Sequence, residues 1–350
     1  MKNVQFRFYT VSATITILCA LMIIQPKITV AQPDKIFESL DEALAVSPTQ
    51  VYQLDLLMSD LTELPKEITQ FTNLEVLYLY ENQLTKLPPF IGDLANLRIL
   101  HLDDNQLTSL PPEIGKLKKL ETLGLHNNKL TTLPKEIGQL TNLKVLYLTE
   151  NRITTIPKEI GNLKNLESLD LAFNEISVIP EEIGSLTNLV ELFLAHNKLK
   201  TIPASIKNLS KLLNLYLDDN AINACPPEIG QLENLEVLSL ADNELEALPE
   251  EVGKLLKLVS FYLSENKLKE LPEDIGFLGR LEYFYVNGNY LTKLPEEMAN
   301  MRNLKELNLY NNKLRVLPQE FDQLIKLQNL GIGGNQITVL PMGLANCEIY

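Results

Sequence analysis

Asparagine recurs at a fixed interval along most of this chain, and this regularity constrains the fold more than any other feature. The interval is 23 residues, without insertion, from Asn82 to Asn335. Leucines keep the same spacing, as Leu-x-x-Leu-x-Leu before the asparagine and Leu-x-x-Leu-Pro after it. Extending the register backwards adds a copy at residue 51, with Ser59 in the asparagine place. The sequence thus holds 13 repeats over 51–349, and so long a periodicity is typical of a solenoid.

Each part of the repeat, numbered from its first leucine, has a physical role. The Leu-x-Leu section alternates apolar and other residues, which predicts a short strand of a parallel sheet. We expect the asparagine at position 9 to be buried, with its amide bonded to the backbone of neighbouring coils. Proline at position 15 suits the first position of a short helical turn, and a following carboxylate such as Glu136 is favoured there by the helix dipole. The predicted fold is an α/β solenoid with a parallel sheet and short helical turns.

Residues 1–31 have the features of an export signal. Lys2 and Arg7 precede an apolar stretch, and small residues around Ala31 suit cleavage by signal peptidase. Two alternatives stay open. The stretch is at the short limit for a retained membrane anchor, and Cys19 is an alternative point of lipid attachment. Cleavage after Ala31 is the interpretation we favour, which would place the mature protein outside the cell, on its surface or in the periplasm.

The two ends of the repeat array differ. Residues 32–50 predict an N-terminal capping helix that begins with Asp34 as N-cap. One face of this helix would carry Ile36, Phe37, Leu40 and Leu44. At the other end the chain stops at Tyr350, directly after the thirteenth repeat.

The last predicted strand contains three glycines, and its edge has no visible cover. These are Gly331, Gly333 and Gly334. An uncovered strand edge presents unpaired backbone groups to a second chain. The sequence therefore predicts a homodimer through the C-terminal edge as one mode of association.

Composition excludes several classes of partner and chemistry. The net charge is −14 and the pI about 4.8. Nucleic acids and heparin-like glycans are therefore not expected as partners, because their binding needs clusters of lysine and arginine. The three cysteines offer no disulfide framework and no paired metal motif. Cys225 and Cys347 replace apolar residues of the repeat, so we expect both to be small buried side chains. No cofactor is predicted.

The repeat resembles a known family. The stretch Leu-Thr-Asn-Leu-Lys-Val-Leu-Tyr-Leu-Thr-Glu-Asn-Arg-Ile-Thr-Thr-Ile-Pro-Lys-Glu-Ile-Gly at residues 140–161 is similar to the 23-residue class of leucine-rich repeats. Within that class it most resembles the exported leptospiral leucine-rich-repeat proteins, over residues 34–350. The resemblance implies a horseshoe with a parallel concave sheet, and a role in binding proteins, including those of a host. A weaker resemblance is to cytosolic repeat proteins that scaffold small GTPases, a setting against which the export signal argues.

Positions 3, 5, 7 and 8 of each repeat should face the concave side, because side chains alternate along a strand. No lysine or arginine occupies any of these positions, whereas aromatic and acidic residues are common there. The alternative is that the rings only pack across strands and the acids only aid solubility, but solubility does not explain the exclusion of cations. The candidate partner-binding residues are Tyr78, Tyr80, Asp103, Asp104, Tyr147, Asp170, Phe173, Phe193, Tyr216, Asp218, Asp219, Asp242, Tyr262, Tyr283, Tyr285 and Tyr310.

The histidines of this face suggest a second, weaker hypothesis. His101 and His126 lie on adjacent predicted strands, and Asp103 lies beside His126. With strands about 5 Å apart, the three side chains would be near enough to share a metal ion. The alternative, which applies to most exposed histidines, is that they bind no metal.

No part of the chain remains for a catalytic domain, and no nucleophile triad, phosphate loop or zinc spacing is present. We therefore predict a protein that is not an enzyme. The predicted function is an exported protein-binding module whose acidic, aromatic concave surface holds a partner with a basic or neutral surface. The alternative is a structural scaffold within the bacterium's own envelope. The sequence does not distinguish the two.

Overall fold

A computed structural model describes residues 35–341, 344 and 347–350. The predicted export signal at 1–31, and Asp34 with it, lie outside the described residues.

The described residues form one parallel sheet whose strands follow each other in chain order. Its repeat strands are β2 (Gln53–Asp55), β3 (Val76–Tyr78), β4 (Ile99–His101), β5 (Thr122–Gly124), β6 (Val145–Tyr147), β7 (Ser168–Asp170), β8 (Glu191–Phe193), β9 (Asn214–Tyr216), β10 (Val237–Ser239), β11 (Ser260–Tyr262), β12 (Tyr283–Tyr285), β13 (Glu306–Asn308) and β14 (Asn329–Gly331). Two shorter strands, β1 (Ile36–Phe37) and β15 (Glu348–Ile349), lie at its ends. Paired residues of neighbouring repeat strands are 23 positions apart, as in Leu146 and Leu169.

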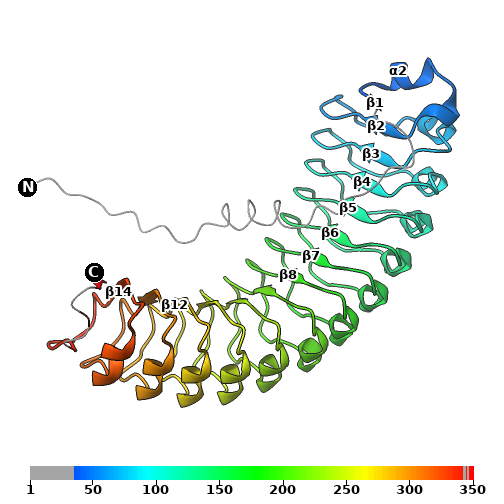
Figure 1. Cartoon of the computed structure of the whole chain (residues 1–350). Helices are drawn as coiled ribbons and strands as arrows, with labels where there is room; N and C mark the ends of the chain where they lie inside the picture. Colours follow the sequence, from blue (N-terminus) through cyan, green and yellow to red (C-terminus); the bar gives the residue numbers. More distant parts are fainter. Residues whose placement is uncertain (1–34, 342–343, 345–346) are drawn as a thin grey trace, which may run out of the picture. The chain divides into compact units, whose positions relative to one another are not determined.

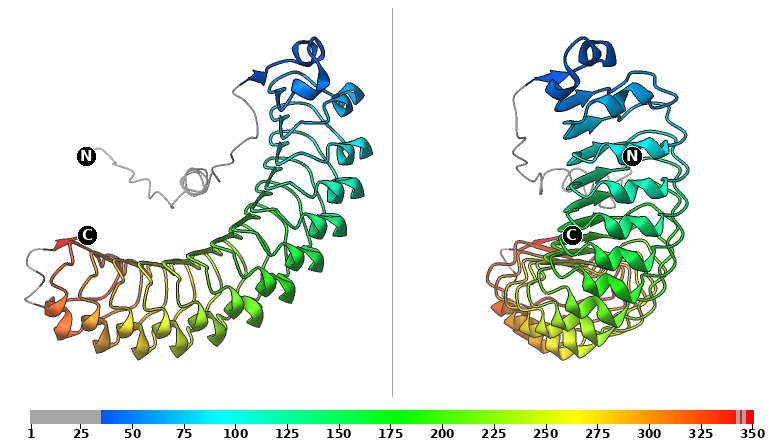
Figure 2. Two further views of the ribbon diagram at one scale, coloured as in Figure 1. Left: turned by 45° about the vertical axis from the view of Figure 1, so that its right-hand side comes forward. Right: turned by 90° about the vertical axis from the view of Figure 1, so that its right-hand side faces the viewer.

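Short 3-10 helices cover the opposite side of each coil. They are η1 (Pro48–Gln50), η2 (Lys66–Gln70), η3 (Pro89–Asp93), η4 (Pro112–Lys116), η5 (Lys135–Gln139), η6 (Lys158–Asn162), η7 (Glu181–Ser185), η8 (Ala204–Asn208), η9 (Pro227–Gln231), η10 (Glu250–Lys254), η11 (Glu273–Phe277), η12 (Glu296–Asn300) and η13 (Gln319–Gln323). Within the described repeats the sheet lines the inner side of the curve and the helices line the outer side (Figures 1 and 2). The predicted solenoid with a concave parallel sheet is therefore confirmed.

The core is a stack of identical layers between sheet and helices. Leu77 and Leu79 of the second repeat point into it and are fully buried. The same positions are buried in each later repeat, except that Ile332 in the last one is partly buried. Because every coil needs its neighbours to cover these leucines, the array is stabilised by contacts between adjacent repeats. Cys225 is buried in this core as predicted, whereas Cys347 is only half-buried.

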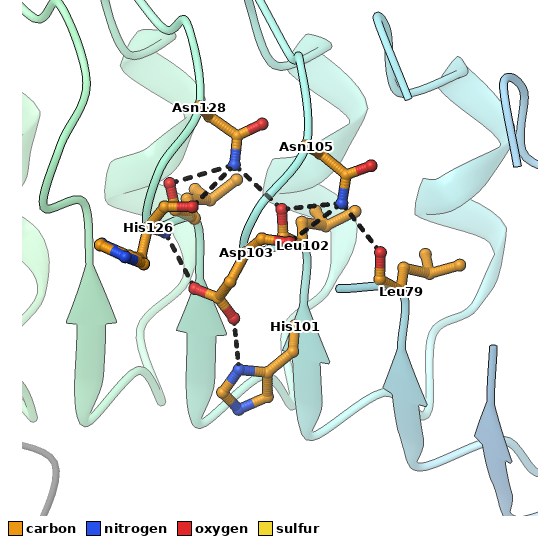
Figure 3. Close-up of polar contacts among 8 residues, drawn as sticks. Leu79, His101, Leu102, Asp103, Asn105, His126 and Asn128 are labelled. Atoms are coloured by element: carbon orange, nitrogen blue, oxygen red, sulfur yellow. Dashed lines mark hydrogen bonds and ion pairs between the residues drawn. The ribbon is translucent and has the colours of Figure 1, made fainter. Parts of the chain in front are cut away.

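The recurrent asparagines form the predicted ladder. Figure 3 shows Asn105, whose Nδ2 donates to the carbonyl oxygen of Leu79 on the preceding coil at 2.8 Å and to those of Leu102 and Asp103 on its own coil. Its Oδ1 accepts from the amide of Leu84 at 2.9 Å. Each buried amide thus satisfies backbone groups that no regular secondary structure pairs.

The residue before each ladder asparagine has a left-handed backbone, which the sequence did not indicate. Position 8 has a positive φ in all 13 repeats, with glycine only at Gly288 and Gly334. Bulky residues adopt it too, for example Phe173 at 54°. Such a conformation costs about 1–2 kcal/mol for most residues. The interactions of the neighbouring coils, including the ladder, therefore override the local preference.

In the repeats from Pro65 to Pro318, the proline at position 15 is the N-cap of the short helix, one residue before the first helical position that we predicted. Pro134 is the N-cap of η5, with φ −67° and ψ 147°, and it is not the first residue of the helix. Its carbonyl oxygen accepts from the amide of Ile137 at 3.0 Å. An N-cap residue keeps an extended backbone while its carbonyl starts the helical bonding, and proline allows both.

The N-terminal cap differs from the single helix that we predicted. Residues Ile36–Phe37 form strand β1, which pairs with β2, and the helix α2 covers only Leu40–Leu44. Ser39 is its N-cap, and its Oγ accepts from the amide of Glu42 at 3.2 Å. Strand pairing satisfies the backbone edge of β2, which a helix face cannot do.

The C-terminal edge of β14 is paired, so the prediction that it is bare was wrong. β15 pairs Glu348 with Asn329, and the carbonyl oxygen of Tyr350 accepts from the amides of Ile332 and Gly333. The paired residues of β14 and β15 are 19 positions apart, so the fixed repeat register missed this strand. The outermost strand at this end of the sheet is therefore β15. The homodimer through the C-terminal edge stays a prediction.

Candidate partner-binding face

The inner face of the sheet consists of strand positions 3 and 5 together with the turn positions 7 and 8 that follow. The predicted residues all lie on this face, but they differ in how far a partner can reach them. Three regions are distinct: a ring cluster near the N-terminal end, a closed centre, and a tyrosine-rich region near the C-terminal end.

The N-terminal region is a cluster of rings on β3 and β4. Tyr78 and Tyr80 meet edge to face with ring centroids 5.8 Å apart, and His101 lies 5.7 Å from Tyr78. All three side chains are partly exposed. Burial raises the pKa of Tyr78, and the neighbouring Tyr80 raises it further. Asp104 lies in the following turn, where its Oδ1 accepts from Asn127 at 2.7 Å.

His101, Asp103 and His126 do not converge as a metal site. Asp103 Oδ2 bonds Nδ1 of His101 at 2.7 Å, and its Oδ1 accepts from the backbone amide of His126 at 2.9 Å. Figure 3 shows the His126 ring turned away from this pair. Among the described residues, no group of three or more His, Cys, Asp or Glu side chains could hold a metal ion. Asp103 instead holds the His101 ring over Gly124. A Cβ on residue 124 would lie only 2.5 Å from Nδ1 of His101, so the ring can take this place only over a glycine.

The centre of the face is closed, which corrects two predicted contacts. Phe193 is 4% exposed and stacks on Tyr216, with ring centroids 5.1 Å apart. Asp170 is 6% exposed, and its Oδ1 accepts from the amide of Ala172 at 3.0 Å. Neither Phe193 nor Asp170 can therefore contribute a substantial contact to a partner. Tyr147, beside them, is partly exposed, and burial raises its pKa to about 12.

Asp170 is expected to lower stability at neutral pH. Burial raises the pKa of its carboxyl. Hydrogen bonds from Thr149 and Ala172 lower it, but burial is the larger effect and the pKa stays raised. The unfolded chain therefore releases this proton at a lower pH, so the contribution of Asp170 to stability falls as pH rises above about 4. Asp170→Asn should raise the urea midpoint at pH 7 and leave it unchanged near pH 3.

The control for this prediction is Glu182→Gln, which removes an equal charge from an exposed turn residue. It should leave the midpoint nearly unchanged at both pH values. A lower midpoint at pH 7 for Asp170→Asn would show that the carboxylate is favourable where it lies.

Carboxylates gather at the strand exits of β9 to β11. Asp218 bonds the hydroxyl of Ser239, and Asp219 Oδ2 bonds Nδ1 of His196 at 2.5 Å. The His196 ring in turn stacks on Phe173, with centroids 4.0 Å apart. Asp242 and Glu265 follow on the next two coils.

Asp242 and Glu265 are exposed and bond no other described side chain. Burial raises the pKa of both carboxyls, and so does a neighbouring carboxylate, Asp219 for Asp242 and Asp242 for Glu265. This edge of the face is therefore a row of unneutralised negative charge.

The C-terminal region carries the predicted Tyr262, Tyr283, Tyr285 and Tyr310, all partly exposed. Tyr262 and Tyr285 stack with ring centroids 5.2 Å apart. The structure adds Tyr350, whose hydroxyl donates to Glu306 Oε1 at 3.5 Å. Sequence reasoning missed Tyr350 because only the shortened last coil, marked by the pairing of Glu348 with Asn329, brings it to the inner face.

Comparison with known families agrees with this geometry. A model of the leucine-rich repeat region matches residues 90–175, 135–221 and 227–336, and a model of the single leucine-rich repeat matches 73–94. The matched residues cover more than half of the chain. The chain belongs to the leucine-rich-repeat family. A comparison with curated proteins finds no match for this leucine-rich-repeat protein.

Solved structures give the same result. A leucine-rich-repeat protein of Leptospira interrogans is 35% identical, with 91% of this chain and 100% of that chain covered and a TM-score of 0.57. A plant peptide hormone receptor in complex with RGF2 is 34% identical, with a TM-score of 0.72 over 80% of this chain and 47% of that one. An internalin of Listeria monocytogenes, 20% identical, has a TM-score of 0.72 over 82% and 83% and shares the fold. The predicted likeness to leptospiral leucine-rich-repeat proteins is confirmed.

The border of the sheet where the strands begin carries paired ions in this leucine-rich-repeat protein. Arg98 Nη2 lies 2.6 Å from Glu121 Oε1, and Lys144 Nζ lies 2.7 Å from Glu121 Oε2. Burial raises the pKa of the Glu121 carboxyl, but the bonds to Lys144 and Arg98 outweigh it, and the pKa lies below its usual value. Paired cations also follow the strand exits, as in Lys198 with Glu175 and Lys267 with Glu244. Asp242 and Glu265 on the inner face itself have no such pairing. No helix among the described residues is long and apolar enough to cross a membrane.

Proposed function

We propose that this leucine-rich-repeat protein is exported and binds a polypeptide partner on its inner face. The observation that carries the proposal is the combination of partly exposed rings with carboxylates such as Asp242 and Glu265, and no lysine or arginine at any inner-face position. Aromatic anchors supply contact area at low entropic cost, and charge of one sign selects the partner. The plant receptor's complex with RGF2 supports a polypeptide as ligand.

The same surface defines the partner's chemistry. Its negative charge favours a protein with a basic or neutral surface and repels nucleic acid and heparin-like glycans. The signal predicted at residues 1–31 would deliver the protein to the cell surface, the periplasm or the medium. A host protein is the partner that we propose. A partner in the cell's own envelope is the outcome that would instead assign a scaffold role.

The test is a selection of random peptides on the full chain, followed by affinity measurements with two matched variants. Asp242→Lys with Glu265→Lys reverses two exposed charges on adjacent inner-face coils. Glu159→Lys with Glu182→Lys makes the same change in net charge on adjacent outer turns. The inner pair should weaken binding of the selected basic peptides about tenfold or more, and the outer pair less than about twofold.

Affinity for these peptides should also fall as salt rises, because exposed charges are screened. Equal weakening by both pairs of substitutions would place the binding site elsewhere. Selection of acidic peptides would contradict the proposal directly.

A further inference from the structure

Five tyrosines gather at the C-terminal end of the inner face, and we call them the tyrosine surface. They are Tyr262, Tyr283, Tyr285, Tyr310 and Tyr350. They come from β11, β12, the turn after β13, and the residue after β15. The stack of Tyr262 on Tyr285, at 5.2 Å and 20° between ring planes, fixes two of the rings relative to each other. A partner that binds here meets rings that are already ordered.

The glycines of the last repeat explain how two further rings lie against the backbone. A Cβ on Gly331 would be 2.9 Å from Cε2 of Tyr350, and one on Gly333 would be 2.5 Å from Cε2 of Tyr310. Both distances are too short for a real side chain. The glycines therefore let the two tyrosines lie directly against the backbone of the last repeat.

Negative charge lies within the tyrosine surface. Glu306 accepts a hydrogen bond from the hydroxyl of Tyr350 and another from that of Tyr285. Burial and this carboxylate raise the pKa of Tyr285 well above its usual range. Glu265 is exposed on a neighbouring coil. A cation beside these rings, Lys305, is bonded to Glu282 at 2.6 Å and stands 5.9 Å from the centroid of Tyr283.

The polar residues between the rings are of a kind that suits protein recognition. Ser260, Ser264, Asn287 and Asn308 occupy inner-face positions of the same coils. Tyrosine with serine, asparagine and glycine is also the composition of antibody binding loops, where tyrosine gives rigid contact area and the small polar residues give adaptable hydrogen bonds. The N-terminal ring cluster has only two tyrosines, Tyr78 and Tyr80, beside His101.

We propose that the tyrosine surface is the main contact for an arginine-bearing polypeptide segment, with guanidinium groups stacked on the rings and paired with Glu306 and Glu265. This proposal rests on the proposed function and assigns its principal site. A guanidinium group can stack on an aromatic face and bond a carboxylate at the same time, which a lysine ammonium does less well. The described residues already contain contacts between a cation and a ring, for example Lys313 Nζ at 4.4 Å from the centroid of Tyr290.

The test uses three synthetic peptides of equal length in a glycine and serine background, with four arginines, four lysines or four glutamates. The chain has no tryptophan, so binding can be followed by quenching of tyrosine fluorescence. The arginine peptide should bind at least about threefold more tightly than the lysine peptide, and the glutamate peptide should not bind. Equal affinity for arginine and lysine would overturn the proposal without any variant.

Variants then locate the contact. Tyr285→Ala should weaken the arginine peptide about thirtyfold, the effect of losing a hot-spot aromatic. Tyr285→Phe keeps the ring and should stay within about threefold of the parent chain. Glu306→Gln keeps the shape, removes the charge and should weaken binding about fivefold. The matched control is Tyr290→Ala, which removes an exposed tyrosine outside the inner face and should change nothing.

These results separate the site from the function. If Asp242→Lys with Glu265→Lys abolishes binding while Tyr285→Ala and Glu306→Gln do not, the inner face binds the partner but the tyrosine surface is not its main contact. Should Tyr285→Ala fail to fold, as circular dichroism would show, Glu306→Gln and the preference for arginine decide the question. Loss of binding with Tyr290→Ala would also overturn the assignment.

Discussion

Phe284→Ala is expected to lower the free energy of unfolding by about 3–5 kcal/mol. Phe284 is the middle residue of β12 and is fully buried. Its ring stacks on that of Phe261 in the neighbouring strand, with centroids 5.7 Å apart. Removing the ring loses its transfer free energy and leaves a cavity between two stacked coils that cannot close without moving the sheet. Urea unfolding followed by circular dichroism measures the change.

Phe284→Leu is the matched control. Leucine occupies this position in most other repeats, so the array can accommodate it at a cost below about 1.5 kcal/mol. Phe261→Ala alone and with Phe284→Ala completes a cycle. Because the two rings touch, their losses should not add. A small and equal loss for Phe284→Ala and Phe284→Leu would mean that the core is loosely packed there.

Asn174→Leu should cost about 3 kcal/mol, because it leaves buried backbone groups without partners. Asn174 Nδ2 donates to the carbonyl oxygens of Leu148, Leu171 and Ala172, at 2.9, 3.1 and 3.1 Å. Its Oδ1 accepts from the amide of Ile153 at 2.9 Å. Leucine has the same branching and number of side-chain heavy atoms but neither donates nor accepts a hydrogen bond. The substitution removes hydrogen bonds that hold two coils together. Hydrogen exchange should therefore rise first at the backbone amides of these two coils.

Asn165→Leu makes the same substitution at an exposed amide and serves as the control. Asn165 Nδ2 also bonds backbone of the preceding coil, the carbonyl oxygen of Thr141 at 2.8 Å. Water can replace this bond when the side chain is removed, so the cost should stay below about 1 kcal/mol. If Asn165→Leu and Asn174→Leu destabilise the protein equally, burial is not the reason for the recurrent asparagine.

The fold could be predicted from the sequence because the repeat has a constant length and a constant pattern of leucines. A 23-residue period leaves one arrangement in which every leucine is covered by its neighbours, and it places a polar amide where the backbone needs one. Asn105 was therefore correctly predicted to be buried and bonded. Alternation along each strand likewise assigned residues such as Tyr78 and Tyr285 to the inner face.

The ends of the array were not determined by the period. Strand β1 and the shortened coil that leads to Tyr350 have no counterpart in the repeat, so the register carried no information about them. The left-handed backbone at position 8 was missed for a related reason. Residues as different as Phe173 and Glu265 adopt it, which shows that contacts between coils impose it and the residue type does not.

Which inner-face side chains a partner can reach depends on packing that the repeat pattern does not encode. Alternation gives the same orientation to Phe193 and Tyr262, yet Phe193 is buried and Tyr262 is partly exposed. Access depends on the volume of side chains on the two adjacent strands, about 5 Å away, and these are 23 residues distant in sequence. The sequence by itself thus fixed the face. The packing across strands decided where on that face the rings and the unneutralised carboxylates meet solvent.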